Sequence, residues 1–364
     1  MLGAAWLLDI VLVAQGTLAM YSAPAALTAS YNVGAMAAVM YAMQVLSGIM
    51  VAMSYVASDA AFHALDHMLR ESTYGWLVRM VHSNGASAVF CALYSHVLRS
   101  WCYGVTAYVL PAVWLLGIVL WVLMMGVAFL GYVLPWGLMS YWALTVITNL
   151  MTVIPLVGQD VLTYSWGGYY ISGLTIQRMF CVHYLLPFVV AAVLTGHLLA
   201  LHVMGSGGPS VVPASTVDGE SFVVYYYKDL YVVGCLAGCI SVLLMCYPDT
   251  LHHPDNHCYV DRYVTPKHIV PEWYFLPFYS MLRACSIKVV GVLLLGVAVL
   301  LYTLLLVVAT EHHHSRCVHT LAEAGAHSSM LLILGVLGQC SPVYPYVDVS
   351  GWVTAVAVST HILF

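Results

Sequence analysis

Two stretches of the chain decide its fold: RMVHSNGASAVFCALYSHVLR at residues 79–99 and RMFCVHYLLPFVVAAVLTGH at residues 178–197. Each carries two histidines 14 positions apart, His82 and His96 in the first and His183 and His197 in the second. Fourteen residues make about 3.9 turns of α-helix, so both histidines of a stretch share one face, roughly 21 Å apart along the axis. One further helix between the stretches gives them the same direction. His82 is therefore expected level with His183, and His96 level with His197.

The composition places these helices in a membrane. Hydrophobic residues make up 62% of the 364 positions and charged residues only 7%, against about 25% charged in soluble domains. So few charges cannot cover a water-facing surface of this size, and the thinly spread net charge of −5 indicates no nucleic-acid partner. Spans of about 20 apolar residues are expected at eight places: 33–54, 76–103, 112–134, 178–202, 229–247, 288–309, 326–340 and 349–364. The predicted fold is an all-α polytopic bundle in which the last two helices are short.

Two level pairs of histidines suit haem iron, which binds one neutral imidazole on each face. A single histidine on an apolar helix face is more often a hydrogen-bonded core residue, but two equal spacings on parallel helices favour two b-type haems. The two ligand pairs are His82 with His183 and His96 with His197.

Glycines repeat the spacing of 14 on the first and third predicted spans. A glycine within a helix lets another group approach the backbone closely, here the edges of the haems. Ordinary packing of small residues explains any one glycine but not the shared spacing. The pairs are Gly34 with Gly48 and Gly117 with Gly131.

Three arginines lie close to these histidines in the sequence, namely Arg79, Arg99 and Arg178. Each is expected to make charge-assisted bonds to a haem propionate. The alternative is an arginine that extends to the membrane interface.

The connections carry weaker signals. Residues 55–75 are expected to form a helix at the membrane surface. No Lys or Arg precedes Arg70, so neither a transit peptide nor a secretory signal is expected, and the few cations give no clear orientation.

The ten cysteines are interpreted as small apolar side chains. Two histidine clusters are interpreted as solvated loops, with metal binding as the alternative: His252, His253 and His257, and His312, His313 and His314.

Several motifs together resemble mitochondrial cytochrome b. They are GYVLPWG at 131–137, TVITNL at 145–150, PEWYFL at 271–276 and HSNGAS at 82–87. The resemblance runs from about residue 30 to the C-terminus. It implies the quinol-oxidising core of ubiquinol–cytochrome c reductase, with two haem b groups and ubiquinol or ubiquinone as substrate. It also implies that the low-potential haem is bound by His82 and His183 and the high-potential haem by His96 and His197. It also implies a di-haem four-helix bundle at residues 1–205 and a quinol-site domain at residues 206–364.

The resemblance further implies partners and a location. The partners are a Rieske-type iron–sulfur subunit, cytochrome c1, membrane lipid and a second copy of the complex. The location is the mitochondrial inner membrane, with the bacterial plasma membrane as the alternative.

Two quinone sites follow from the resemblance. In the outer, oxidising site Glu272 is expected to accept a proton, because burial raises a carboxyl pKa; a helix-capping role is the alternative. The other outer-site residues are Phe129, Tyr132, Gly137, Ile147, Pro271, Tyr274 and Tyr279. The inner, reducing site comprises His202, Ser206, Lys228 and Asp229, with Lys228 expected to hold Asp229 ionised and a solvated loop edge as the alternative.

The chain departs from the family in places. Residues 222–227 read FVVYYY without the family's usual His-Pro. Ala143 stands where the family usually has Gly, and a methyl group there implies weak binding of methoxyacrylate-type inhibitors. Two rival functions remain open: a di-haem anchor of another quinone-linked oxidoreductase, and a histidine-rich transporter without haem.

Overall fold

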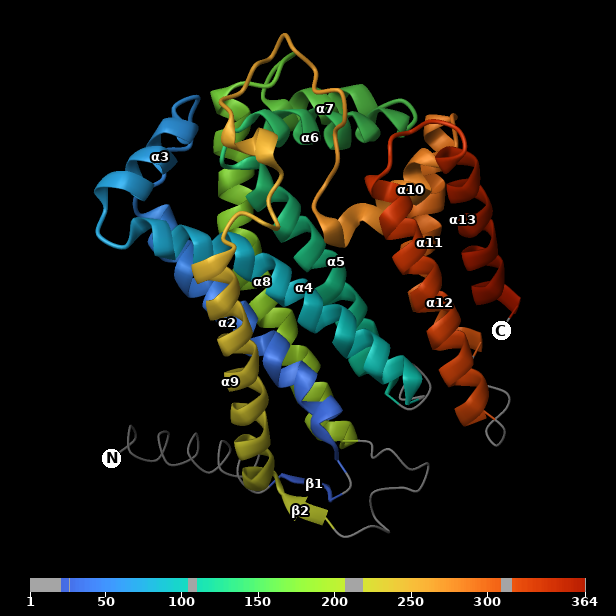
Figure 1. The fold of residues 1–364 in the computed structure, drawn as a ribbon. Coiled ribbons are helices and arrows are strands. Elements are labelled where there is room, and N and C mark those ends of the chain that lie inside the picture. Colours follow the sequence, from blue (N-terminus) through green and yellow to red (C-terminus); the bar gives the residue numbers. More distant parts are fainter. Residues whose placement is uncertain (1–20, 26, 104–109, 207–218, 309–315, 364) are drawn as a thin grey trace, which may run out of the picture.

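A computed structural model describes residues 21–25, 27–103, 110–206, 219–308 and 316–363. The fold is all-α, as predicted, and its long helices stand side by side (Figure 1). Among the described residues, four helical stretches are long and apolar enough to cross a membrane, at 29–52, 111–133, 173–204 and 222–246. The long helices are α2 (Val33–Ala52), α4 (Gly75–Cys102), α5 (Pro111–Val133), α8 (Gly173–Met204), α9 (Phe222–Cys246), α11 (Lys288–Val308), α12 (Arg316–Gln339) and α13 (Tyr346–Leu363).

Short helices cover one end of the bundle. The surface helix expected within 55–75 is α3 (Ala61–Glu71), which buries Ala61, Leu65 and Met68 and leaves its other face to solvent. Figure 1 shows α6 (Leu138–Asn149) and α7 (Gly158–Trp166) lying across the top of the long helices. The remaining short elements are α10 (Leu276–Arg283) and the single turns η2 (Ala29–Asn32), η3 (Leu150–Val153), η5 (Pro254–His257) and η6 (Trp273–Phe275).

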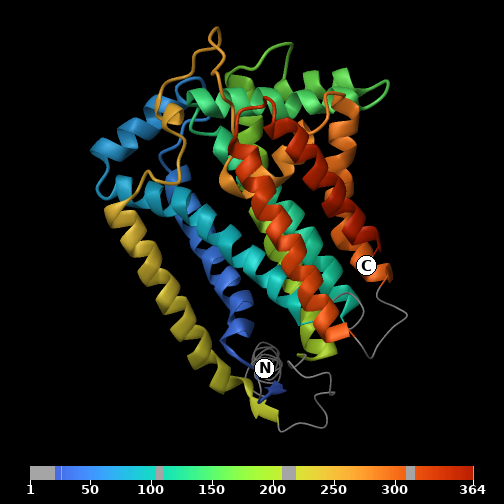
Figure 2. The same cartoon turned by 45° about the vertical axis from the view of Figure 1, so that its right-hand side comes forward.

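Four helices form the predicted histidine-bearing bundle. Helix α2 packs on α4, and α5 packs on α8. Helix α9 lies beside α2 and α4 (Figure 2). At the opposite end from α6, strands β1 (Ser22–Pro24) and β2 (Gly219–Ser221) pair antiparallel, with Ser22 opposite Ser221. This small sheet joins the segment before α2 to the start of α9.

The C-terminal helices form a second group around α10. Helix α10 contacts α11, α12 and α13. Arg283, at the end of α10, donates to the carbonyls of Leu337, Gly338 and Cys340 at 3.1, 2.9 and 3.1 Å, where a cation suits the negative end of α12. A buried cluster that includes Trp121 of α5 and Phe278 of α10 joins this group to the bundle.

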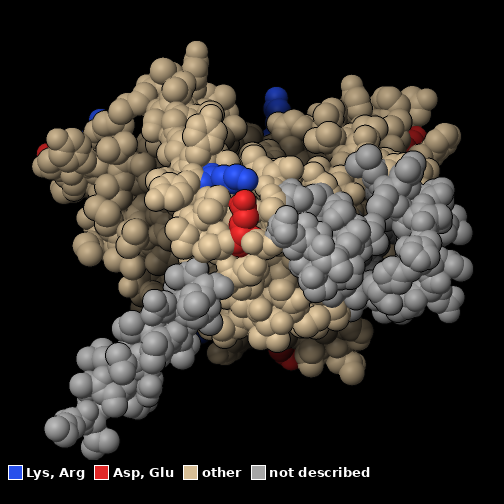
Figure 3. Space-filling model, turned by 90° about the horizontal axis from the view of Figure 1, so that it is seen from below, with Lys and Arg blue, Asp and Glu red and all other residues tan. Residues whose placement is uncertain are grey.

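Several helices begin earlier than predicted, including α8 at Gly173 instead of 178, and the difference is largest for α9 and α12. Helix α9 starts at Phe222 instead of 229, because the aromatic segment continues the helix and Tyr225 is buried against Leu27 and Ala23. Helix α12 starts at Arg316 instead of 326, so the prediction of a short helix there was wrong. A helix can extend past its apolar part, and hydropathy alone does not mark that end. Viewed from the β1–β2 end, few charged side chains are visible on the described surface (Figure 3).

Candidate functional site

The four histidines that are spaced 14 apart on α4 and α8 meet in two pairs, at the two predicted levels. The ring centroids of His82 and His183 lie 6.4 Å apart, and those of His96 and His197 lie 6.5 Å apart. Two imidazoles bound to one metal ion by bonds of about 2 Å would place their ring centroids roughly 6 Å apart. The separation in both pairs therefore fits a shared iron atom.

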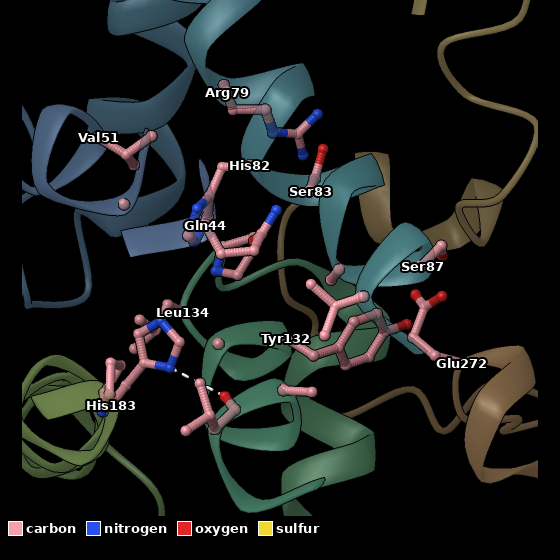
Figure 4. A pocket seen from close by; sticks show the side chains of 18 of the residues that line it. Gln44, Val51, Arg79, His82, Ser83, Ser87, Tyr132, Leu134, His183 and Glu272 are labelled. Carbon is pink, nitrogen blue, oxygen red and sulfur yellow. Dashed lines mark hydrogen bonds between the residues drawn. The ribbon is translucent and has the colours of Figure 1, made fainter. Parts of the chain in front are cut away.

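The Nδ1 atoms of His82 and His183 contact groups on the neighbouring helices. Nδ1 of His183 donates to the carbonyl of Val127 at 2.9 Å, and Nδ1 of His82 lies 3.1 Å from the hydroxyl of Ser47. A metal-binding imidazole commonly uses its second nitrogen in this way, which fixes the ring orientation. Each ring is thereby left with Nε2 for the position between them (Figure 4).

Each of the four glycines that are spaced 14 apart lies against one of these histidines. A Cβ atom at any of the four would lie within 3.3 Å of a ring carbon, closer than ordinary contact. The structure thus brings the two patterns together, and the donor set with its glycine cradle fits two bis-histidine haems. The distances to Cε1 are 3.0 Å for Gly34 and His96, 2.8 Å for Gly48 and His82, 3.3 Å for Gly117 and His197, and 2.7 Å for Gly131 and His183.

A cavity runs from the His82–His183 pair to the outer-site residues. Its lining includes Arg79, Tyr132 and Glu272. Figure 4 shows the hydroxyl of Tyr132 from α5 pointing toward the carboxyl group of Glu272. Burial raises the pKa of Glu272 from 4.5 to about 7, so this carboxyl group can take up and release a proton near neutral pH.

The segment around Glu272 is fixed by α4. Trp273 donates through Nε1 to the hydroxyl of Ser87 at 3.0 Å. The buried ring of Tyr274 stacks on Phe90 with centroids 4.0 Å apart, and Tyr94 donates to the backbone carbonyl of Tyr274. These contacts preorganise the carboxyl group at the cavity wall.

Five other outer-site candidates are not part of the described lining of this cavity. Gly137 contacts Asn256 so closely that a Cβ atom would lie 2.3 Å from that backbone carbonyl. The hydroxyl of Tyr279 donates to the carbonyl of Ile269 at 2.8 Å. The remaining three are Phe129 on α5, Ile147 on α6 and Pro271 just before Glu272.

The three arginines differ in their surroundings. Arg79 lines the cavity beside His82 (Figure 4). The guanidinium of Arg99 lies 4.4 Å from the ring centroid of Tyr31. Arg178 donates to the carbonyl of Tyr164 and lies over its ring. Of the three, Arg79 alone belongs to the described cavity lining.

The inner-site candidates gather at the end of the bundle that carries the small sheet. The ring of His202 lies 4.6 Å from that of Tyr21, whose hydroxyl is 2.8 Å from the hydroxyl of Ser206. Asn32 donates to the carboxylate of Asp229. Instead of the expected pairing with Asp229, Lys228 donates to the carbonyl of Leu27 at 3.4 Å and lies over the ring of Tyr225.

Some site residues were missed by sequence reasoning. Tyr21 carries no motif, and its contact with Ser206 spans 185 positions. The solvated-loop prediction was wrong for His252, whose side chain is only 14% exposed. Burial lowers the pKa of His252 to about 4, and with His253, Asn256 and His257 it lines the outer cavity. The prediction for residues 312–314 lies outside the described residues.

Comparison with known proteins agrees with this geometry. Residues 18–205 match the family model "Cytochrome b/b6/petB", and residues 259–358 match "Cytochrome b(C-terminal)/b6/petD". Cytochrome b of Phytophthora megasperma is 38% identical over 340 residues, which is 90% of this chain and 87% of the relative. Cytochrome b of Rickettsia bellii is 39% identical over 335 residues, 91% of this chain and 84% of the relative.

A solved structure described as a hyperthermophilic respiratory Complex III has the same fold. One of its chains superposes with a TM-score of 0.88 at 23% identity, covering 97% of this chain and 95% of that chain. Together with the family models and the relatives, the facing histidines and their glycines place the chain in the cytochrome b family.

Proposed function

We propose that the chain is the quinol-oxidising core subunit of a respiratory ubiquinol–cytochrome c reductase. The observation that carries this proposal is the cavity that joins a facing histidine pair to the buried carboxyl group of Glu272. A redox subunit of this kind needs a metal-binding pair and a proton acceptor within one enclosed space. The family membership and the described geometry both support it.

In this proposal His82 and His183 hold one haem b and His96 and His197 hold a second. When bound there, the two haems would supply one-electron carriers between the outer and the inner site. The protein contributes ligation, placement and electrostatics. Arg79 lies beside His82 in the cavity and is placed to neutralise a propionate.

The outer site oxidises quinol and releases its protons. A quinol gives up two protons with its two electrons, so its hydroxyl groups need an acceptor at the wall of the cavity. Glu272 fills this role, because a carboxyl group with a pKa of about 7 binds and releases protons at similar rates near neutral pH. The Tyr132 hydroxyl, which points toward Glu272 (Figure 4), is placed to orient the quinol or that carboxyl group.

The inner site reduces quinone and takes up protons. His202 and Asp229 lie at the opposite end of the bundle, and Asn32 donates to the carboxylate of Asp229. A histidine and a carboxylate can deliver the two protons that a reduced quinone needs. Release at one end and uptake at the other would translocate protons across the membrane.

In this proposal one of the two electrons of quinol passes to the haems. The complex would therefore also need partners that accept the other electron. We assign these roles to a Rieske-type iron–sulfur subunit and cytochrome c1, in a dimeric assembly within membrane lipid. The mitochondrial inner membrane is the proposed location. The bacterial plasma membrane is the alternative, because the Rickettsia relatives are bacterial.

A redox titration of the reduced-minus-oxidised spectrum tests the proposal. The complex is expected to titrate with two b-type components, and His82→Asn is expected to remove the low-potential component alone. His67→Asn, on the exposed face of α3, serves as the control. If the spectrum shows no b-type band, both functions that require haem are refuted and a transporter is favoured. If one component titrates instead of two, the binding of two haems by the two histidine pairs is refuted. Two haems without quinol oxidation would favour another di-haem anchor.

A further inference from the structure

Three side chains of the loop after α9 converge beside the outer cavity, whose lining includes His252 and His257. The carboxylate oxygen Oδ1 of Asp249 lies 3.8 Å from Nδ1 of His252 and 3.8 Å from Nε2 of His257. One donor atom from each residue lies within 4.8 Å of the others. These distances are too long for hydrogen bonds. They are close to the roughly 3.4 Å that separates two donors on a tetrahedral zinc ion with bonds of about 2.0–2.1 Å.

His252 has no hydrogen-bond partner for its ring among the described residues. Both Nδ1 and Nε2 of this imidazole are buried without one. A buried polar atom is normally hydrogen-bonded, because leaving it unpaired costs free energy. A metal ion at this position would bind one of the two unpaired nitrogens and lower that cost.

The loop that carries these residues is fixed at both ends. Asn84 of α4 donates to the carbonyl of Pro248 at 2.9 Å, just before Asp249. The backbone N–H of Leu138 donates to the carbonyl of Cys258 at 2.9 Å, just after His257. Anchors on α4 and α6 hold the three donors near one another without an ion, as a preorganised site requires.

We propose that Asp249, His252 and His257 bind a divalent transition-metal ion of the zinc class. Two imidazoles and one carboxylate are a donor set typical of zinc with a fourth position left for water. Calcium and magnesium prefer oxygen donors throughout. The mixed nitrogen and oxygen set therefore selects the transition metal.

Neighbouring charges set limits on this site. Arg79 interacts electrostatically with both Asp249 and His252, so a bound cation competes with its guanidinium for the carboxylate. Asp255 faces His253 at 4.0 Å instead. His252 and His257 line the outer cavity, but none of the three ligands is assigned a role in the proposed quinol chemistry, so zinc binding can be measured separately from quinol oxidation.

Zinc binding to the purified complex tests the proposal. The complex is stripped with a chelator and dialysed against buffered free Zn²⁺, and the bound zinc is counted by elemental analysis. The wild-type complex is expected to hold one more zinc ion per chain than His252→Asn or His257→Asn. Loss of a hydrogen-bond partner of a metal ligand already weakens binding about 10- to 100-fold, so loss of a ligand should weaken it at least as much.

The control is His67→Asn on the exposed face of α3, which should bind as much zinc as the wild type. An unchanged haem spectrum shows that each variant is folded. If a variant does not assemble, X-ray absorption at the zinc edge of the wild type decides. Two imidazoles and a carboxylate around the ion support the site. An oxygen-only shell, or equal zinc in the wild type and both histidine variants, would overturn it.

Discussion

Gly131 lies directly against the ring of His183: a Cβ atom at this glycine would lie 2.7 Å from Cε1 of the histidine. Such a contact is too short for the ring to keep its place. We therefore expect Gly131→Ala to displace His183 and to reduce or abolish the low-potential b-type component in a redox titration, although alanine itself favours a helix.

Gly126→Ala on the same helix is the matched control. A Cβ atom there would meet Cδ2 of Leu186 at 3.6 Å, an ordinary contact. This variant should keep both components. Equal spectra for the two alanine variants would show that the 131 position does not hold the ligand in place.

Glu272→Gln is expected to remove a pH dependence of quinol oxidation. Burial raises the pKa of Glu272 to about 7, so the carboxyl group is protonated below that pH and accepts a proton only above it. The wild-type rate should therefore rise as pH increases through about 7. The glutamine variant should be slow and lack this rise.

The phenol of Tyr274 does not account for such a step. Burial raises the pKa of the Tyr274 phenol above its ordinary value, which moves its ionisation away from neutral pH. Glu71→Gln, on the exposed side of α3, should leave the pH profile unchanged. A rise through pH 7 that persists in Glu272→Gln would assign the proton to another group.

The parts of the site that lie within regular helices could be predicted from the sequence. Helix geometry converts a spacing of 14 into a level and a face, so the pairing of His82 with His183 needed no knowledge of loops. The surroundings of His252 could not be predicted in this way. They depend on the contacts of Asn84 with Pro248 and of Leu138 with Cys258, which join segments distant in the sequence.

Asn32→Asp is expected to slow quinone reduction at the inner site. Asn32 donates to the carboxylate of Asp229, and an aspartate in its place would set a second negative charge against that carboxylate. Two like charges at about 4 Å repel by roughly 4 kcal/mol at an effective dielectric constant of 20. The rate at which added quinone oxidises the high-potential haem, with the outer site inhibited, measures the effect.

Glu220→Gln on strand β2 controls for a general change of charge at this end, since Glu220 is exposed. It should leave that rate unchanged. The same rate in Asn32→Asp and in the wild type would remove Asp229 and its partner from the inner site.

Ala143→Gly is expected to raise sensitivity to methoxyacrylate-type inhibitors of the outer site. Ala143 is buried, 7% exposed, on α6, the helix that begins directly after Gly137. An extra methyl group in a packed site costs about 1–3 kcal/mol, which corresponds to roughly 5- to 150-fold in affinity. Inhibitor titrations of quinol oxidation should show a fall of that size in the half-inhibiting concentration.

Thr145→Ser is the matched control, because it removes a methyl group from the same helix while keeping a hydroxyl for the bond to the carbonyl of Tyr141. This variant should not change the half-inhibiting concentration. Full inhibition of the wild type at ordinary concentrations, or equal sensitivity of Ala143→Gly and the wild type, would show that this methyl group does not limit binding.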